Sequence, residues 1–176
     1  MIEPWNPDIL EVSSTGPAAS VHDVKMGIYT KIEGISINEN NVWKHASGRQ
    51  FIYFMNNVWM IGSDYSNSIS GIKTKDKDNM MISDNTWLYY NEDEIWHDDD
   101  GSILVKEYYP EKFSVNSSTI GTSSEAPEWI GIYKQVPNLI KNKKPVWKNT
   151  NLEYYLHYTV GKYLEPRTKY IYLSFR

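Results

Sequence analysis

Apolar and aromatic side chains occur along this chain in short runs, and Asn, Asp and Gly separate one run from the next. Runs of this kind at intervals of about 8–12 residues are typical of an all-β fold. A one-turn helix over 125–129, after a Ser cap, is the one helical element that we predict. The strands that we predict from the pattern lie at 42–45, 50–54, 58–62, 69–72, 80–83, 86–90, 95–98 and 103–109.

One segment of the chain is repeated. "GIYTKIEGISINENNVWKHASGRQFIYF" begins at Gly27, and "GIYKQVPNLIKNKKPVWKNTNLEYYLHY" begins at Gly131, so the two align without a gap at a separation of 104 residues. Aromatic positions stay aromatic, aliphatic positions stay aliphatic, and polar positions differ. This is how two copies of one packed unit diverge, and it predicts two related lobes of antiparallel meander or sandwich type.

The repeat sets the expected organisation. We expect an extended N-terminal arm over 1–26, a first unit over 27–113, a Ser/Thr-rich linker over 114–128 and a shortened second unit over 129–176 that packs on the first. The C-terminal "YIYLSF" reads as an edge strand. We expect it to pair within the chain, with domain swapping or edge-to-edge pairing between chains as the alternative.

Composition narrows the function classes. The 176 residues include no cysteine, which excludes disulfides and Cys-based metal or redox sites. The net charge is −4, and the 18 basic residues look scattered apart from Lys141, Lys143 and Lys144, which argues against a binder of duplex nucleic acid. No apolar run is long enough for a membrane span. The lack of cysteine and of a signal peptide favours a cytoplasmic or virion-associated setting.

The succession "NENNVWKH", "FIYFMNNVWMIG", "TWLYY" and "IWHDDD" resembles a β-rich aromatic module found in uncharacterised eukaryotic and protist proteins. The resemblance covers about residues 27–105 and, more weakly, 131–166. The second copy keeps the proline of the module's turn at Pro145, whereas the first copy has Asn41 there. No activity comes with this resemblance, and it implies a modular, non-enzymatic role.

The 14 Tyr and 7 Trp residues suit either a core or a binding surface. In the first interpretation the tryptophan rings are buried and the neighbouring lysines are solvated. In the second, exposed rings stack on a sugar or a partner side chain while lysines bind beside them; Trp87 and Trp96 could join that surface. The residues that we predict for binding on this basis are Trp43, Lys44, Tyr53, Trp59, Trp147 and Lys148.

Catalytic and metal chemistry find little support in the pattern. The acidic stretch "NEDEIWHDDDG" over 91–101 lacks the spacing of a Ca²⁺ loop and reads as two solvated turns. His22, His45, His97 and His157 show no metal-ligand spacing. We therefore expect no catalytic residue, metal or cofactor. The expected function is protein–protein association, with glycan binding as the alternative and a hydrolase using unidentified carboxylates as a weaker one.

Overall fold

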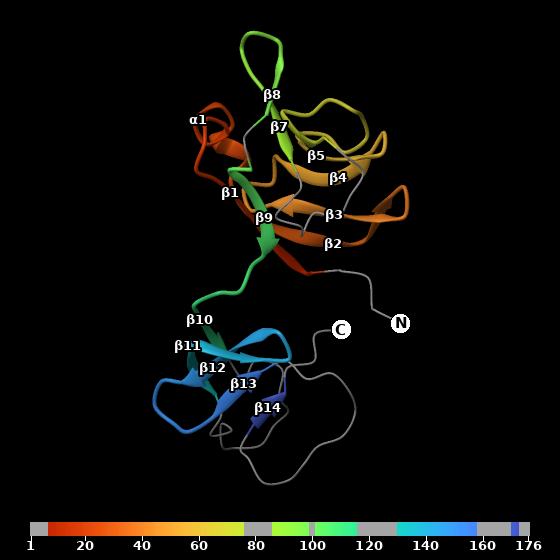
Figure 1. Ribbon diagram of the computed structural model, residues 1–176. Helices are drawn as coiled ribbons and strands as arrows, with labels where there is room; N and C mark the ends of the chain where they lie inside the picture. Colours follow the sequence, from red (N-terminus) through yellow and green to blue (C-terminus); the bar gives the residue numbers. More distant parts are fainter. Residues whose placement is uncertain (1–6, 76–85, 99–100, 116–129, 158–169, 173–176) are drawn as a thin grey trace. The chain divides into compact units, whose positions relative to one another are not determined.

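The computed structural model describes residues 7–75, 86–98, 101–115, 130–157 and 170–172 (Figure 1). It divides into two compact units, Met1–Tyr108 and Tyr109–Arg176. The expected strand at 80–83 and the expected helix at 125–129 lie outside the described residues. The elements of the first unit are β1 (Ile9–Ser14), α1 (Ala18–Val21), the 3₁₀ helix η1 (Asp23–Lys25), β2 (Gly27–Ile37), β3 (Asn40–His45), β4 (Phe51–Met55), β5 (Val58–Gly62), β6 (Ile72–Thr74), β7 (Trp87–Tyr90), β8 (Trp96–Asp98) and β9 (Ile103–Glu107). Those of the second are β10 (Lys112–Val115), β11 (Gly131–Lys141), β12 (Lys144–Asn149), β13 (Tyr155–His157) and β14 (Tyr170–Tyr172).

The first unit is one nine-stranded sheet in the order β8-β7-β6-β5-β4-β3-β2-β1-β9, antiparallel throughout. Its two edge strands, β8 and β9, follow each other in the chain, and Asp98 and Ile103 are only five residues apart. Five residues span at most roughly 18 Å. The sheet must therefore curl until its edges lie near each other, which confirms the predicted all-β, meander-type fold.

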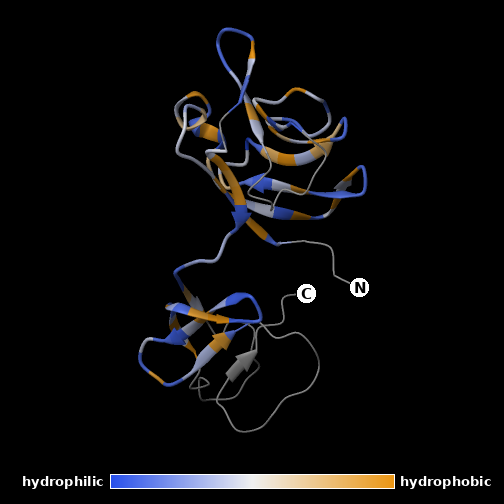
Figure 2. Ribbon diagram, viewed as in Figure 1, coloured by the Kyte–Doolittle hydropathy of each residue, from blue (hydrophilic) through white to orange (hydrophobic). Residues whose placement is uncertain are grey.

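The curl gives the first unit an inner and an outer cluster of apolar side chains. Figure 2 shows hydrophobic residues in the strands of the sheet, whereas the β7–β8 hairpin is mostly hydrophilic. The outer cluster is the smaller one: Val42, Tyr53 and Met60 are buried there, and Ile32, Ile35 and Ile37 of β2 pack against them. The inner cluster consists of Leu10, Val12, Ala18, Tyr29, Trp43, Ile52, Trp59, Ile61, Ile72, Trp87, Tyr89, Ile103 and Val105.

The second unit is a five-stranded sheet in the order β10-β11-β12-β13-β14. Its first four strands are antiparallel, and β14 pairs parallel with β13 within the chain. The described part of the C-terminal segment, β14, thus lies in the sheet of its own unit.

The repeat is visible in the backbone of the two units. β2 and β11 begin and end 104 residues apart, and so do β3 and β12. The ladder shifts register between Lys31 and Ser36 in the first copy, and between Gln135 and Ile140 in the second. Both hairpins turn through two residues of positive φ, Asn38 and Glu39 (50° and 65°) or Asn142 and Lys143 (52° and 64°). The two segments, whose polar residues differ, therefore adopt one local structure.

The boundaries of the units differ from those expected. Residues 1–26 are not only an arm, because β1 pairs with both β2 and β9 and α1 buries Ala18 in the core. Residues 112–115 form β10 of the second sheet rather than part of the first unit and its linker. β1 and β10 are themselves copies of each other, since Leu10 faces Tyr29 and Phe113 faces Tyr133. Their offset is 103 residues, and the ungapped alignment therefore did not reach them.

Candidate binding surface

Three of the aromatic residues predicted for binding lie in the core of the first unit. Trp43, Tyr53 and Trp59 are 2%, 0% and 8% exposed. The Trp43 indole Nε1 donates to the Pro7 carbonyl oxygen at 2.9 Å, and the Trp43 and Trp59 rings meet edge to face at 5.9 Å. No ligand can stack on these rings unless the core opens. Their burial agrees with the interpretation in which the aromatic rings belong to the core.

Trp147 occupies the Trp43 position of the second copy and is half-buried. Its indole Nε1 donates to the Pro110 carbonyl oxygen at 2.7 Å, and its ring packs against Phe113 at 5.6 Å and Tyr109 at 6.2 Å. Pro7 and Pro110 are 103 residues apart, like β1 and β10. Both tryptophans therefore hold the chain that leads into the first strand of their own unit.

The two remaining predicted residues, Lys44 and Lys148, lie on the outer faces of the two sheets. Lys44 is exposed. Lys148 belongs to a row of three lysines, because it faces Lys134 on β11 and Lys134 faces Lys112 on β10. We call Lys112, Lys134 and Lys148 the lysine row. Side chains directly opposite on neighbouring strands have Cβ atoms about 4.5–5.5 Å apart, so three ammonium groups share one strip of the sheet.

The lysine row is accessible and mostly without a counter-charge. Lys112 and Lys134 are exposed, and neither has an ion-pair partner among the residues that the structure describes. The row ends at Lys148, whose ammonium donates to the Glu153 carboxylate at 2.6 Å. The Tyr155 hydroxyl, next to Lys148 in the ladder, donates to the other Glu153 oxygen at 3.1 Å. These hydrogen bonds, that of Lys148 first, lower the pKa of the Glu153 carboxyl.

The first unit lacks this row at the same place. Its residues in the matching register are Ile9, Thr30 and Lys44, so it has one lysine where the second unit has three. Like charges directly opposite on neighbouring strands destabilise a sheet. The module can evidently fold without them, and folding alone therefore does not explain Lys112 and Lys134.

The division into units also separates the charges of the chain. Residues 1–108 contain 8 basic and 17 acidic side chains, a net charge of −9, whereas residues 109–176 contain 10 basic and 5 acidic ones, a net charge of +5. Ten of the 18 basic residues but only five of the 22 acidic ones therefore belong to the second unit. The overall charge of −4 conceals two units of opposite sign.

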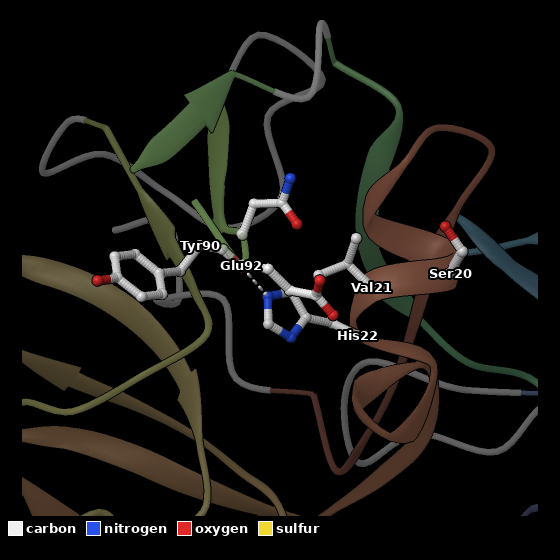
Figure 3. A pocket seen from close by; sticks show the side chains of 6 residues that line it. Ser20, Val21, His22, Tyr90 and Glu92 are labelled. Carbon is white, nitrogen blue, oxygen red and sulfur yellow. Dashed lines mark hydrogen bonds between the residues drawn. The ribbon is translucent and has the colours of Figure 1, made fainter. Parts of the chain in front are cut away.

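A second feature is an open pocket of about 570 Å³ in the first unit, lined by Ser20, Val21, His22, Tyr90, Asn91 and Glu92 (Figure 3). Because a carbonyl oxygen only accepts, His22 Nε2 carries the proton and donates to the Tyr90 carbonyl at 2.7 Å. Burial lowers the pKa of His22, with the Tyr90 hydrogen bond opposing this and the Lys25 charge adding to it. Ser20 Oγ donates to the Pro17 carbonyl rather than to His22, so the two do not form a nucleophile–base pair.

The acidic stretch at 91–101 and the histidines do not form a metal site in the described part of the chain. No group of three or more His, Cys, Asp and Glu side chains is placed there to hold a metal ion. Asp93 instead binds His97, with Nε2 2.8 Å from one carboxylate oxygen. Asp99 and Asp100 lie outside the described residues. None of the described helices has the length and apolar character needed to cross a membrane.

Of the three lysines in the row, Lys148 was named in the sequence analysis, and Lys112 and Lys134 were not. The three lysines are 22 and 14 residues apart in the sequence, and only the strand register brings them together. The signal that could have found them was the comparison of the two copies, since Lys134 aligns with Thr30 in the ungapped repeat. Comparison of the chain with protein-family models, with curated proteins and with solved structures gave no match.

Proposed function

We propose that this protein is a non-enzymatic association module that binds an acidic protein surface through the lysine row. The observation that carries the proposal is the register of Lys112, Lys134 and Lys148 across three neighbouring strands, which brings like charges together on an exposed face. Such an arrangement is unfavourable in the free protein and becomes favourable when an anionic partner covers it.

A carboxylate partner is favoured by the contact already present at the end of the row. Glu153 accepts from Lys148 and from the Tyr155 hydroxyl, so this surface binds a carboxylate within its own chain. Ile132 lies two residues before Lys134 on the same face of β11 and is 40% exposed. An apolar side chain beside the charges suits contact with a protein, whose interfaces combine apolar cores with polar rims.

The structural role of the repeated aromatic residues supports association rather than catalysis. Trp43 and Trp147 bind the Pro7 and Pro110 carbonyls, and Tyr29 and Tyr133 are both fully buried. These shared aromatic residues thus serve the fold of each module, while Lys112 and Lys134, which the first copy lacks, lie on the outer face. The resemblance to an aromatic β-rich module points in the same direction.

The test is a titration with a fluorescent poly-L-glutamate peptide as the acidic probe. We expect saturable binding that weakens as salt rises from about 0.05 M to about 1 M, because screening shortens the Debye length to about 3 Å. Lys134→Glu should weaken binding at least about tenfold. Lys44→Glu is the matched control, since it makes the same charge change on the other unit, and it should leave the affinity within about twofold.

Folding is separated from binding by a second variant. Lys134→Thr introduces the residue that the first copy has at this position, and it removes two like-charge contacts at once. We expect it to weaken the binding of the probe while the protein stays at least as stable as the wild type. Equal losses from Lys134→Glu and Lys44→Glu would contradict the proposal, and so would tighter binding of a single-stranded RNA oligonucleotide than of poly-L-glutamate.

One cluster of aromatic side chains supports glycan binding as a second candidate function. On the β7–β8 hairpin, Tyr90 is 36% exposed, its ring lies 5.3 Å from that of half-buried Trp96, and Lys73 Nζ lies 4.0 Å from the Trp96 ring centroid. Aromatic rings beside a cationic donor can stack on a sugar. If this is the function, an oligosaccharide panel should raise the melting temperature, and Tyr90→Ala should abolish the shift. A flat panel would exclude it.

A further inference from the structure

We infer that the acidic partner of the lysine row is the first unit of a second copy of this chain, so that the protein associates head to tail. This inference rests on the proposed function and names the partner for the same surface. It is carried by charge complementarity: the row lies on a unit of net charge +5, and the other unit of the same chain has a net charge of −9. Any solution of this protein therefore contains the acidic unit at the same concentration as the basic one.

The acidic side chains of the second unit are too few to balance its basic ones. Residues 109–176 include only five acidic side chains against ten basic ones. One of the five, Glu153, already binds Lys148, and Lys112 and Lys134 have no ion-pair partner among the described residues. The first unit has an excess of nine carboxylates, so placing it against the row reduces the repulsion within both units.

The contact is heterologous, because it joins unlike surfaces of two identical chains. Such contacts form a closed dimer when two of them are reciprocal, and longer assemblies when they are not. In either case every added chain brings one basic and one acidic surface. The mass of the assembly should therefore rise with protein concentration, and it should fall as salt screens the charges.

Sedimentation velocity tests the inference from about 1 to about 100 μM protein, at about 0.05 M and about 1 M salt. The wild type should associate at low salt and be monomeric at high salt. Lys134→Glu and Lys134→Thr should each weaken association at least about tenfold. Lys44→Glu, with the same net charge as Lys134→Glu, should not weaken it. Glu153→Gln, which frees Lys148, should strengthen it by a few-fold.

Mixing the proteins separates a head-to-tail contact from one between two second units. Lys134→Glu lacks a functional row but keeps an intact first unit, so it should still be taken up by the row of a labelled wild-type chain. A contact between two second units would be lost in the mixture too. Association of the mixture, combined with its weakening in Lys134→Glu alone, is the result that supports the inference.

The failure of this inference can be distinguished from the failure of the proposed function. A wild-type chain that stays monomeric at all concentrations, yet binds poly-L-glutamate through Lys134, overturns the second copy as partner and leaves the proposed function standing. A chain that neither associates nor binds the probe contradicts both. Association that is insensitive to salt and to Lys134→Glu also overturns the inference, because another surface would then be responsible.

Discussion

A single hydrogen bond fixes the entry of the chain into each sheet. The indole of Trp43 binds the Pro7 carbonyl, and that of Trp147 binds the Pro110 carbonyl, although the two tryptophans differ in burial. Pro7 is buried and Pro110 is half-buried. A carbonyl that loses its donor is costly only to the extent that water cannot reach it. The same bond should therefore matter more in the first unit than in the second.

Trp43→Phe should destabilise the first unit by about 2–4 kcal/mol, since it leaves the buried Pro7 carbonyl unsatisfied and opens a cavity in the core. Trp147→Phe should destabilise the second unit by only about 1–2 kcal/mol, because water can reach Pro110. Urea denaturation followed by circular dichroism measures both. A larger loss from Trp147→Phe would contradict this explanation.

His22 provides a pH dependence at the same scale. Burial lowers its pKa in the folded protein below the value of 6.5 that it has in the unfolded chain. Below that pH the unfolded chain binds more protons, so the stability that His22 contributes is present above pH 6.5 and is lost as the pH falls. Urea midpoints measured at about pH 7 and pH 5 should differ less in His22→Gln than in the wild type. An unchanged difference would exclude His22 as the source.

At the scale of elements, three hairpins in the described part of the chain turn through two residues of positive φ. Glu39 and Lys143 occupy the second position of such turns with φ of 65° and 64°, and Asn57 does so with 63°. Glycine is favoured at this position of a type I′ turn, whereas side chains with a Cβ are strained there. The first position is Asn in all three turns, which tolerates the conformation.

Glu39→Gly should therefore stabilise the first unit by about 0.5–1 kcal/mol, since relief from the left-handed strain exceeds the added entropy of the unfolded chain. Lys143→Gly should have an effect of similar size in the second unit. Lys44→Gly serves as the control, because a glycine within a strand should destabilise by about 0.5–1 kcal/mol. Melting temperatures of the three variants rank them, and a destabilised Glu39→Gly would show that the turn is not strained.

The sequence predicted where the strands lie better than it predicted which strands pair with each other. The bounds of β5 were predicted without error and those of β3, β4, β7 and β8 to within about two residues, because Asn and Gly turns separate these runs of apolar residues. β6 begins at Ile72 rather than at Ile69. The pairing of β1 with β9 could not be predicted, because the apolar pattern within a strand does not identify a partner strand far away in the sequence. The lysine row depends on register across three strands and was out of reach for the same reason.

At the scale of the molecule, the chain consists of two units with separate sheets and opposite charge. Each has its own buried centre, around Trp43 and Ile52 in the first and around Tyr133 and Leu156 in the second. Proteins with two such centres commonly unfold in more than one step. Because the boundary separates an acidic unit from a basic one, the net charge of the whole chain, −4, is smaller in magnitude than that of either unit.

Calorimetry should accordingly resolve two unfolding transitions. Trp43→Phe should lower the temperature of one of them, and Trp147→Phe should lower that of the other, because each substitution affects the core of its own unit. The transition that Lys134→Thr moves should be the one that Trp147→Phe moves. One transition shifted by all three variants would show that the units unfold cooperatively.

The pairing of β1 with β9 has a consequence for synthesis on the ribosome. Among the nine strands of this sheet β1 is made before the others and β9 after them, so the edge of β1 that pairs with β9 stays uncovered at least until residue 107 has been added. At about 5–20 residues per second, that interval lasts about 5–20 s. An uncovered strand edge is a template for pairing with other chains. The nascent protein is thus most exposed to misassembly with neighbouring polysomal chains before its ninth strand leaves the exit tunnel.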